Sequence, residues 1–121
     1  KLAFIENRYH YYSSATHHHL KSHGLKYTIF IQPSPHSKKL LSEEERNAIG
    51  SLDIYKGYEL VKKNMNKLSL KNIRVVNLDK IFHDVTESIY IDKIHLNSTG
   101  VEIISNAIAS HLAQINHWSF L

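Results

Sequence analysis

Two short apolar runs constrain the fold of this chain more than any other feature. They are Tyr27–Gln32 and Ile73–Leu78, and apolar residues follow one another in them rather than alternating with polar ones. Continuous runs of this length are typical of strands that are buried on both faces, as in parallel sheets. Parallel strands need a long connection, and the segment between the runs is long enough to hold a helix. We therefore expect two adjacent parallel strands, at about 27–32 and 73–78, joined by a right-handed crossover.

Helical patterns surround both runs. Residues 3–23 repeat apolar and aromatic side chains at spacings of three and four, and Gly24 follows where a helix end favours glycine. A capping box, Ser42–Glu45, predicts the start of a second helix that runs to about residue 66. A second capping box, Thr99–Glu102, predicts the start of a final helix. Five tyrosines lie at helical spacing, and most of them are expected to pack in the core or at its boundary rather than form a stacking platform: Tyr9, Tyr11, Tyr12, Tyr55 and Tyr58.

The order of these elements is helix, strand, helix, strand, long loop, helix, and it indicates an α/β fold. Two parallel strands make a poor sheet, because each strand exposes an edge of unpaired backbone groups. We therefore expect the chain, residues 1–121, to be the C-terminal portion of a single larger domain. The same open edge predicts self-association through the sheet.

Composition excludes several classes of function. The chain has 121 residues and no Cys, which excludes disulfides, thiolate zinc sites and a cysteine nucleophile. No apolar run approaches the ~20 residues that span a bilayer. The net charge of +4 is spread along the chain, and the densest lysine cluster, residues 62–71, lacks interleaved arginines and aromatics. We therefore expect no nucleic-acid partner, and a basic nucleic-acid-binding module remains the weakest alternative.

The long loop between the second strand and the final helix, residues 79–97, contains the residues with the clearest chemistry. Ligands of open α/β sheets bind beyond the carboxyl ends of the strands, where this loop begins. Asp92 lies three residues before His95. One turn at this spacing brings the carboxylate to the imidazole Nδ1, which leaves Nε2 free to act as a general base.

This region resembles the C-terminal part of the SGNH hydrolases, the family of the GDSL esterases and lipases. The resemblance rests on Asp92-Lys93-Ile94-His95, continued as residues 96–100 and placed before the final helix. It implies a flavodoxin-like three-layer α/β/α fold of which this chain forms the C-terminal half. It also implies hydrolysis of a small-molecule, lipid or carbohydrate O-acyl ester through a serine nucleophile, with His95 as base and Asp92 as its orienting partner. No metal or organic cofactor is implied.

The chain lacks the other parts that the family uses. It contains no Gly-Asp-Ser block for the nucleophile, and no glycine and Gly-x-Asn-Asp blocks for the oxyanion. No nucleophile is assigned to any of the serines considered, which are Ser13, Ser14, Ser34, Ser37 and Ser98. Without a nucleophile and oxyanion donors, we expect this chain alone to be inactive. The alternative to an enzyme is a non-catalytic SGNH-like α/β domain that binds a ligand or partner.

Other polar residues admit two interpretations. Gln32 and Asn97 could contact substrate or could satisfy backbone groups as turn or cap residues. His83 and Asp84 share the loop of the Asp-x-x-His motif and could border the site or be solvated. His19 and His23, preceded by His17 and His18, could hold zinc on one helical face or form a polar surface.

Overall fold

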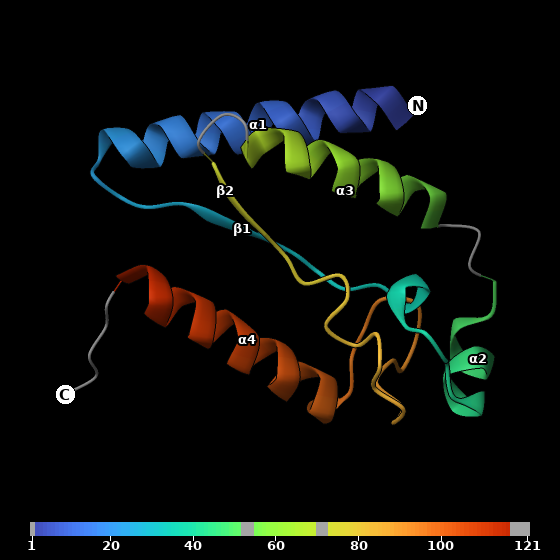
Figure 1. Cartoon of the computed structure of the whole chain (residues 1–121). Helices are drawn as coiled ribbons and strands as arrows, with labels where there is room; N and C mark the ends of the chain where they lie inside the picture. Colours follow the sequence, from blue (N-terminus) through green and yellow to red (C-terminus); the bar gives the residue numbers. More distant parts are fainter. Residues whose placement is uncertain (1, 52–54, 70–72, 117–121) are drawn as a thin grey trace. The chain divides into compact units, whose positions relative to one another are not determined.

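The computed structural model describes residues 2–51, 55–69 and 73–116. The elements follow in the order expected from the sequence, with one additional break (Figure 1). They are α1 (Leu2–Ser22), β1 (Thr28–Ile31), the short 3-10 helix η1 (Pro35–Ser37), α2 (Glu43–Ile49), α3 (Tyr55–Ser69), β2 (Arg74–Asn77) and α4 (Ser98–Asn116). The chain divides into two compact units. Unit 1 comprises residues 1–31 and 51–77, and unit 2 comprises residues 32–50 and 78–121.

Unit 1 is built on the two strands. β1 and β2 pair in parallel, with Ile29 opposite Val75 and Ile31 opposite Asn77. This confirms the prediction of adjacent parallel strands, each one residue shorter at either end than expected. Among the described residues the sheet has two strands, and α1 and α3 run side by side along it (Figure 1). The structure is thus mixed α/β.

The core of unit 1 lies between α3 and one face of the sheet. Ile31, Met65, Leu68 and Ile73 are buried there. Partly buried side chains extend this cluster from both layers: Tyr27, Ile29, Tyr58, Val61 and Val75. The odd-numbered strand positions share one face because side chains alternate along a strand, and α3 supplies the opposing apolar stripe.

The prediction of one long crossover helix is wrong. The helix ends at Ile49, and Gly50 adopts φ +62°, a conformation that residues with a side chain rarely adopt. The physical reason is that the two halves serve different cores. Ile49 is buried in unit 2, whereas Met65 and Leu68 of α3 are buried in unit 1. The capping box itself is confirmed, because Ser42 Oγ accepts from Glu45 N at 3.1 Å and Glu45 Oε2 accepts from Ser42 N at 2.8 Å.

On the lysine-rich face of α3, Glu59 lies four residues before Lys63, a spacing that favours an ion pair between them, but it pairs with Lys62 instead. Glu59 Oε1 accepts from Lys62 Nζ at 2.7 Å, one turn away on the solvated surface. Lys63 and Lys67 are exposed, and Lys71 lies outside the described residues. Exposed pairs of this kind contribute little to stability.

Unit 2 packs a second core around the long loop. Ile49, Phe82, Ile89 and Tyr90 are buried, and the rings of Phe82 and Tyr90 meet edge to face with centroids 5.8 Å apart. The partly buried residues around them come from the loops and from α4: Leu41, Ile81, Val85, Leu96, Ile103 and Ile104. The loop of residues 79–97 contains no helix in the structure. Its own side chains form much of this core, which explains how so long a connection stays ordered.

The start of α4 differs from the second predicted capping box. Asn97 is the cap, and its Oδ1 accepts from Gly100 N at 2.9 Å. A Cβ on Gly100 would lie 2.7 Å from Ile89 Cγ2 and 3.1 Å from Leu96 Cβ. Gly100 therefore lets the first turn of α4 approach the loop closely, and the helix begins two residues earlier than the Thr99–Glu102 box indicated, with Asn97 rather than Thr99 as its cap.

Candidate functional site

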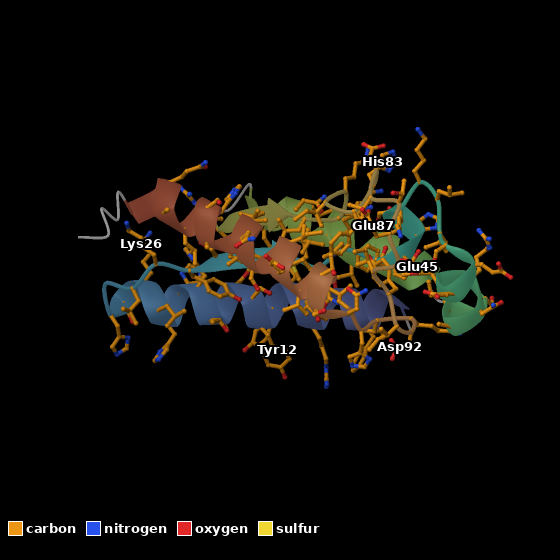
Figure 2. The ribbon with its side chains drawn as sticks, turned by 90° about the horizontal axis from the view of Figure 1, so that it is seen from below. Tyr12, Lys26, Glu45, His83, Glu87 and Asp92 are labelled. Atoms are coloured by element: carbon orange, nitrogen blue, oxygen red, sulfur yellow. The ribbon has the colours of Figure 1, made fainter. Side chains whose placement is uncertain are left out.

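The Asp-x-x-His motif lies in a short loop that the chain closes on itself. Tyr90 and Leu96 form an antiparallel bridge, and Ile91 N donates to His95 O at 3.1 Å. Residues 91–95 are therefore held between two backbone contacts. Figure 2 shows Asp92 projecting at the outer edge of this part of the chain.

The side chains of Asp92 and His95 meet, as the spacing predicts. His95 Nδ1 lies 2.7 Å from Asp92 Oδ2. The other carboxylate oxygen, Oδ1, accepts from the backbone N–H groups of Ile94 and His95, both at 2.7 Å. Asp92 thus closes the turn and contacts the imidazole with the same carboxylate. The His95 side chain is 72% exposed, so its far nitrogen, Nε2, faces solvent.

The electrostatics of this pair fix the proton on the imidazole. The hydrogen bond from the His95 backbone N–H, the contact with the His95 ring and the Ile94 N–H lower the pKa of Asp92 from 3.8 to about 2. Asp92 is therefore ionised at neutral pH and can only accept hydrogen bonds. His95 Nδ1 must carry the proton of the shared bond, so the neutral ring presents Nε2 as a base.

Two residues outside the motif hold its loop. Gln32, which directly follows β1, donates from Nε2 to the carbonyl of Ile94 at 3.2 Å. Asn97 donates from Nδ2 to Ser88 O at 2.6 Å and from its backbone N to Ile89 O at 2.8 Å. Both residues satisfy backbone groups, which agrees with the second of the two interpretations given for them. The Gln32 bond ties the motif's loop to the first residue after β1.

The structure brings none of the other candidates to His95. The ring of His83 contacts Ser37 O at 2.9 Å through Nδ1, and Asp84 is exposed. Ser37 donates to the buried carboxylate of Asp79 and lies 3.3 Å from Ser34 Oγ. No described serine is hydrogen-bonded to His95. The pair therefore has a base and its orienting carboxylate, and the described residues give it no nucleophile.

The histidines of α1 are arranged as neighbouring rings. His19 and His23 lie with centroids 4.7 Å apart, and His23 Nδ1 is 2.9 Å from the His19 carbonyl oxygen. Across the described part of the chain, no group of three His, Asp or Glu side chains has the arrangement of a metal site. The contacts seen are those of an exposed helix surface.

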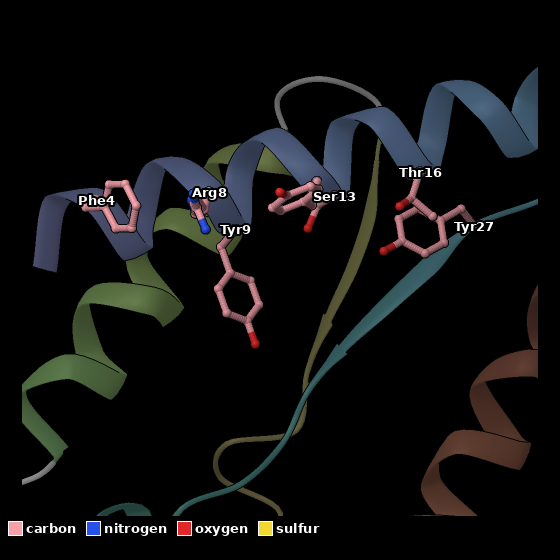
Figure 3. Close-up of a pocket in the computed structure, with 7 residues that line it drawn as sticks. Phe4, Arg8, Tyr9, Ser13, Thr16 and Tyr27 are labelled. Atoms are coloured by element: carbon pink, nitrogen blue, oxygen red, sulfur yellow. The ribbon is translucent and has the colours of Figure 1, made fainter. Parts of the chain in front are cut away.

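A recess of about 460 Å³ lies in unit 1, along α1. Figure 3 shows Tyr9 extending from the helix and Tyr27 beside Thr16, with Phe4 and Arg8 nearer the helix start. Tyr58 packs against the core of unit 1, as predicted, and the side chain of Tyr55 lies outside the described ones. Contrary to the prediction, Tyr9, Tyr11 and Tyr12 are exposed, by 52%, 68% and 60%. The face of α1 that turns inward carries Ser13 and His17 instead, so the spacing was right for a helix but identified the wrong side.

The sequence analysis did not predict that Glu45 contacts the long loop. This residue was identified only as the acidic member of a capping box, yet its side chain is fully buried and also contacts the backbone of the long loop. A glutamate at this position is ordinary for a helix start. The one sign in the sequence was the run of three glutamates, Glu43–Glu45, since a helix start does not need all three and one can form contacts elsewhere.

Comparisons with protein-family models, curated proteins and solved structures gave no significant match to this chain. The described helices include none that is both long and apolar enough to cross a membrane.

Proposed function

We propose that this chain supplies the Asp–His part of a serine ester hydrolase of the SGNH type, whose nucleophilic serine lies upstream of it in a longer protein. The observation that carries the proposal is the 2.7 Å contact between His95 Nδ1 and an ionised Asp92, with Nε2 of the same ring facing solvent. The resemblance of residues 92–100 to the family's last motif supports the same assignment.

The reaction follows from this arrangement. Nε2 of neutral His95 accepts the proton of the serine hydroxyl while Oγ forms a bond to the ester carbonyl carbon. Asp92 stabilises the imidazolium that results and keeps its ring in place. The imidazolium then donates the proton to the leaving alcohol, and an acyl-serine remains. Water attacks this ester by the same two proton transfers and releases the acid. The substrate class proposed is an O-acyl ester of a small molecule, lipid or carbohydrate.

The test compares the longer protein, expressed from its natural reading frame, with variants at His95. We expect His95→Ala to lower the turnover of a short-chain aryl ester by at least about a thousandfold, because the base contributes on this order. Folding should be unchanged, since the side chain is exposed. His18→Ala, an exposed histidine of α1, is the matched control and should keep full turnover. We expect the isolated 121-residue chain to show no turnover.

Two results would contradict the proposal. Full turnover in the His95→Ala protein would remove the assigned base, and serine-dependent turnover by the isolated chain would place the nucleophile within it. The alternative is an SGNH-like domain without catalysis, favoured by the lack of any described serine bonded to His95. A longer protein with no ester turnover and no serine that reacts with a fluorophosphonate would establish that alternative.

A further inference from the structure

One buried ion pair makes several of the longer-range hydrogen bonds of unit 2. Glu45 Oε2 accepts from Lys38 Nζ at 2.6 Å, and both side chains are fully shielded from solvent. A buried charge is costly unless it is paired and its remaining hydrogen-bonding capacity is used. Both conditions are met here, because the two charges pair and their remaining hydrogen bonds are made to backbone groups. These further contacts identify the segment that the pair holds in place.

Besides the capping contact of Glu45 with Ser42 N, these contacts lie on residues 87–90, the segment that leads to the Asp92–His95 pair. Glu45 Oε1 accepts from Ile89 N at 2.8 Å and from Tyr90 N at 3.1 Å. Lys38 Nζ donates to Glu87 O at 2.6 Å. Figure 2 shows Glu45 and Glu87 on neighbouring segments of this unit. The buried pair therefore binds three backbone groups within four consecutive residues.

The same segment is held from its other side by the residues after the motif. Asn97 binds the carbonyl groups of Ser88 and Ile89. Tyr90, whose N–H is bound by Glu45, is the residue that bridges to Leu96 and so closes the loop of the motif. The residues on either side of 91–95 therefore belong to, or bind, the segment 87–90. The buried pair binds the backbone of that same segment.

We propose that Glu45 is a positioning residue for the Asp92–His95 pair. It fixes the backbone at Ile89 and Tyr90, and through the Tyr90–Leu96 bridge it sets the distance at which the carboxylate meets the imidazole. The use of this positioning in catalysis rests on the proposed function. The positioning itself can be measured in the 121-residue chain without any substrate.

The experiment reads the His95 tautomer in this chain by long-range proton–nitrogen NMR, at a pH where the imidazole is neutral. In the native chain Asp92 should keep the proton on Nδ1. Glu45→Gln has the same shape but cannot accept at both ends, because its amide nitrogen is a donor. We expect most of the His95 population in this variant to change to the Nε2–H tautomer that free imidazole prefers. Glu43→Gln, an exposed change in the same turn of α2, is the matched control and should leave the tautomer unchanged.

A second variant covers the case in which Glu45→Gln leaves Lys38 charged and does not fold. Lys38→Met with Glu45→Leu removes both charges and the oxygen that accepts from Ile89 N and Tyr90 N, and neutral replacement of a buried ion pair is commonly tolerated. Amide signals of Ile49 and Phe82 report whether the core of unit 2 is intact. A folded variant with the native His95 tautomer would overturn the proposal. So would failure of both variants to fold, because Glu45 would then be a general requirement of unit 2.

The result is separable from that of the proposed function. If His95→Ala keeps full ester turnover while Glu45→Gln changes the His95 tautomer, the catalytic assignment fails and the positioning stands. If turnover depends on His95 but the tautomer is insensitive to Glu45, the catalytic assignment stands and the positioning fails.

Discussion

Each of the two units of this chain is stabilised by a different kind of internal interaction. Unit 1 is a small sheet packed on α3, with an apolar core of Ile31, Met65, Leu68 and Ile73. Among its described residues, the buried side-chain atoms Ser14 Oγ and His17 Nδ1 have no hydrogen-bond partner, and the tyrosines of α1 are exposed. Unit 2 combines its apolar core with the buried Lys38–Glu45 pair and its backbone contacts.

The difference shows where this chain needs a defined geometry. Apolar contacts are non-directional, so a core such as that of unit 1 tolerates small shifts. Charge-assisted hydrogen bonds fix both distance and direction, and the buried pair among the described residues, Lys38–Glu45, lies in the unit that contains Asp92 and His95. The exposed tyrosines and the open sheet edge of unit 1 are instead features of a surface to which another strand or another protein chain can bind.

The largest expected effect comes from breaking the polar network of unit 2. Lys38→Met leaves Glu45 buried and unpaired, and removal of one partner of a buried pair costs about 3–5 kcal/mol. Residue-resolved hydrogen exchange should show this loss at Ile89 and Tyr90, with the amides of β1 and β2 little affected. Lys39→Met, at an exposed neighbouring lysine, is the control. Equal losses in both units would show that they unfold as one.

The reciprocal change is in the core of unit 1. Leu68 is fully buried between α3 and the sheet, and Leu68→Ala should cost about 2–5 kcal/mol through lost packing and the cavity left behind. The exchange of amides in Ile29–Ile31 should accelerate, while the His95 tautomer stays native. A changed tautomer in this variant would contradict the separation of the two units.

Acid should act mainly on unit 2. Burial raises the pKa of Glu45, but hydrogen bonds from Lys38 and from the N–H groups of Ile89, Ser42 and Tyr90 outweigh it, so this pKa lies below 4.5. The pKa of Asp92 is lowered from 3.8 to about 2. Each carboxylate binds a proton more weakly in the folded state, so its stabilisation is complete above the ordinary pKa and is lost as the pH falls through the folded value. Near-native behaviour at pH 6 and selective loss of unit 2 signals between about pH 4 and 2 are expected.

NMR spectra recorded over an acid titration check this expectation directly. Resonances of Ile49 and Phe82 report unit 2, and those of Leu68 and Val76 report unit 1. Earlier loss of the unit 1 signals would contradict the comparison.

The smallest effect on stability is expected at the exposed aromatic face of unit 1. The open sheet edge predicts self-association, and Tyr12 lines the recess in the same unit. Tyr12→Glu should change stability by less than about 0.5 kcal/mol, because the side chain is exposed. It should weaken association in sedimentation velocity at matched concentrations. Tyr11→Glu is the control, since Tyr11 is more exposed and does not line the recess. A monomeric native chain would contradict the predicted association.

The sequence predicted much of the local structure but few of the tertiary contacts that stabilise it. The two strands, the helix of residues 3–23 and the Asp92–His95 contact follow from runs and spacings within a few residues, because backbone geometry sets them. The break at Gly50 was missed because helix propensity tolerates a glycine there, and only the presence of two separate cores requires it. The helix start was misplaced because the side chain of Asn97, rather than that of Thr99, accepts from the first turn of α4.

The sequence by itself determined the order of the helices and strands and a carboxylate placed to orient an imidazole, since each depends on residues close together in the chain. The pairing of the two strands joins residues 46 apart, and the sequence indicated it through the continuous apolar character of both runs and the long connection between them. The tertiary structure decided which face of α1 is buried, where the crossover helix divides, and that Glu45 joins α2 to a segment 44 residues away. No local pattern encodes such a contact. It exists because a buried carboxylate must find donors, and the fold brings the N–H groups of Ile89 and Tyr90 within reach.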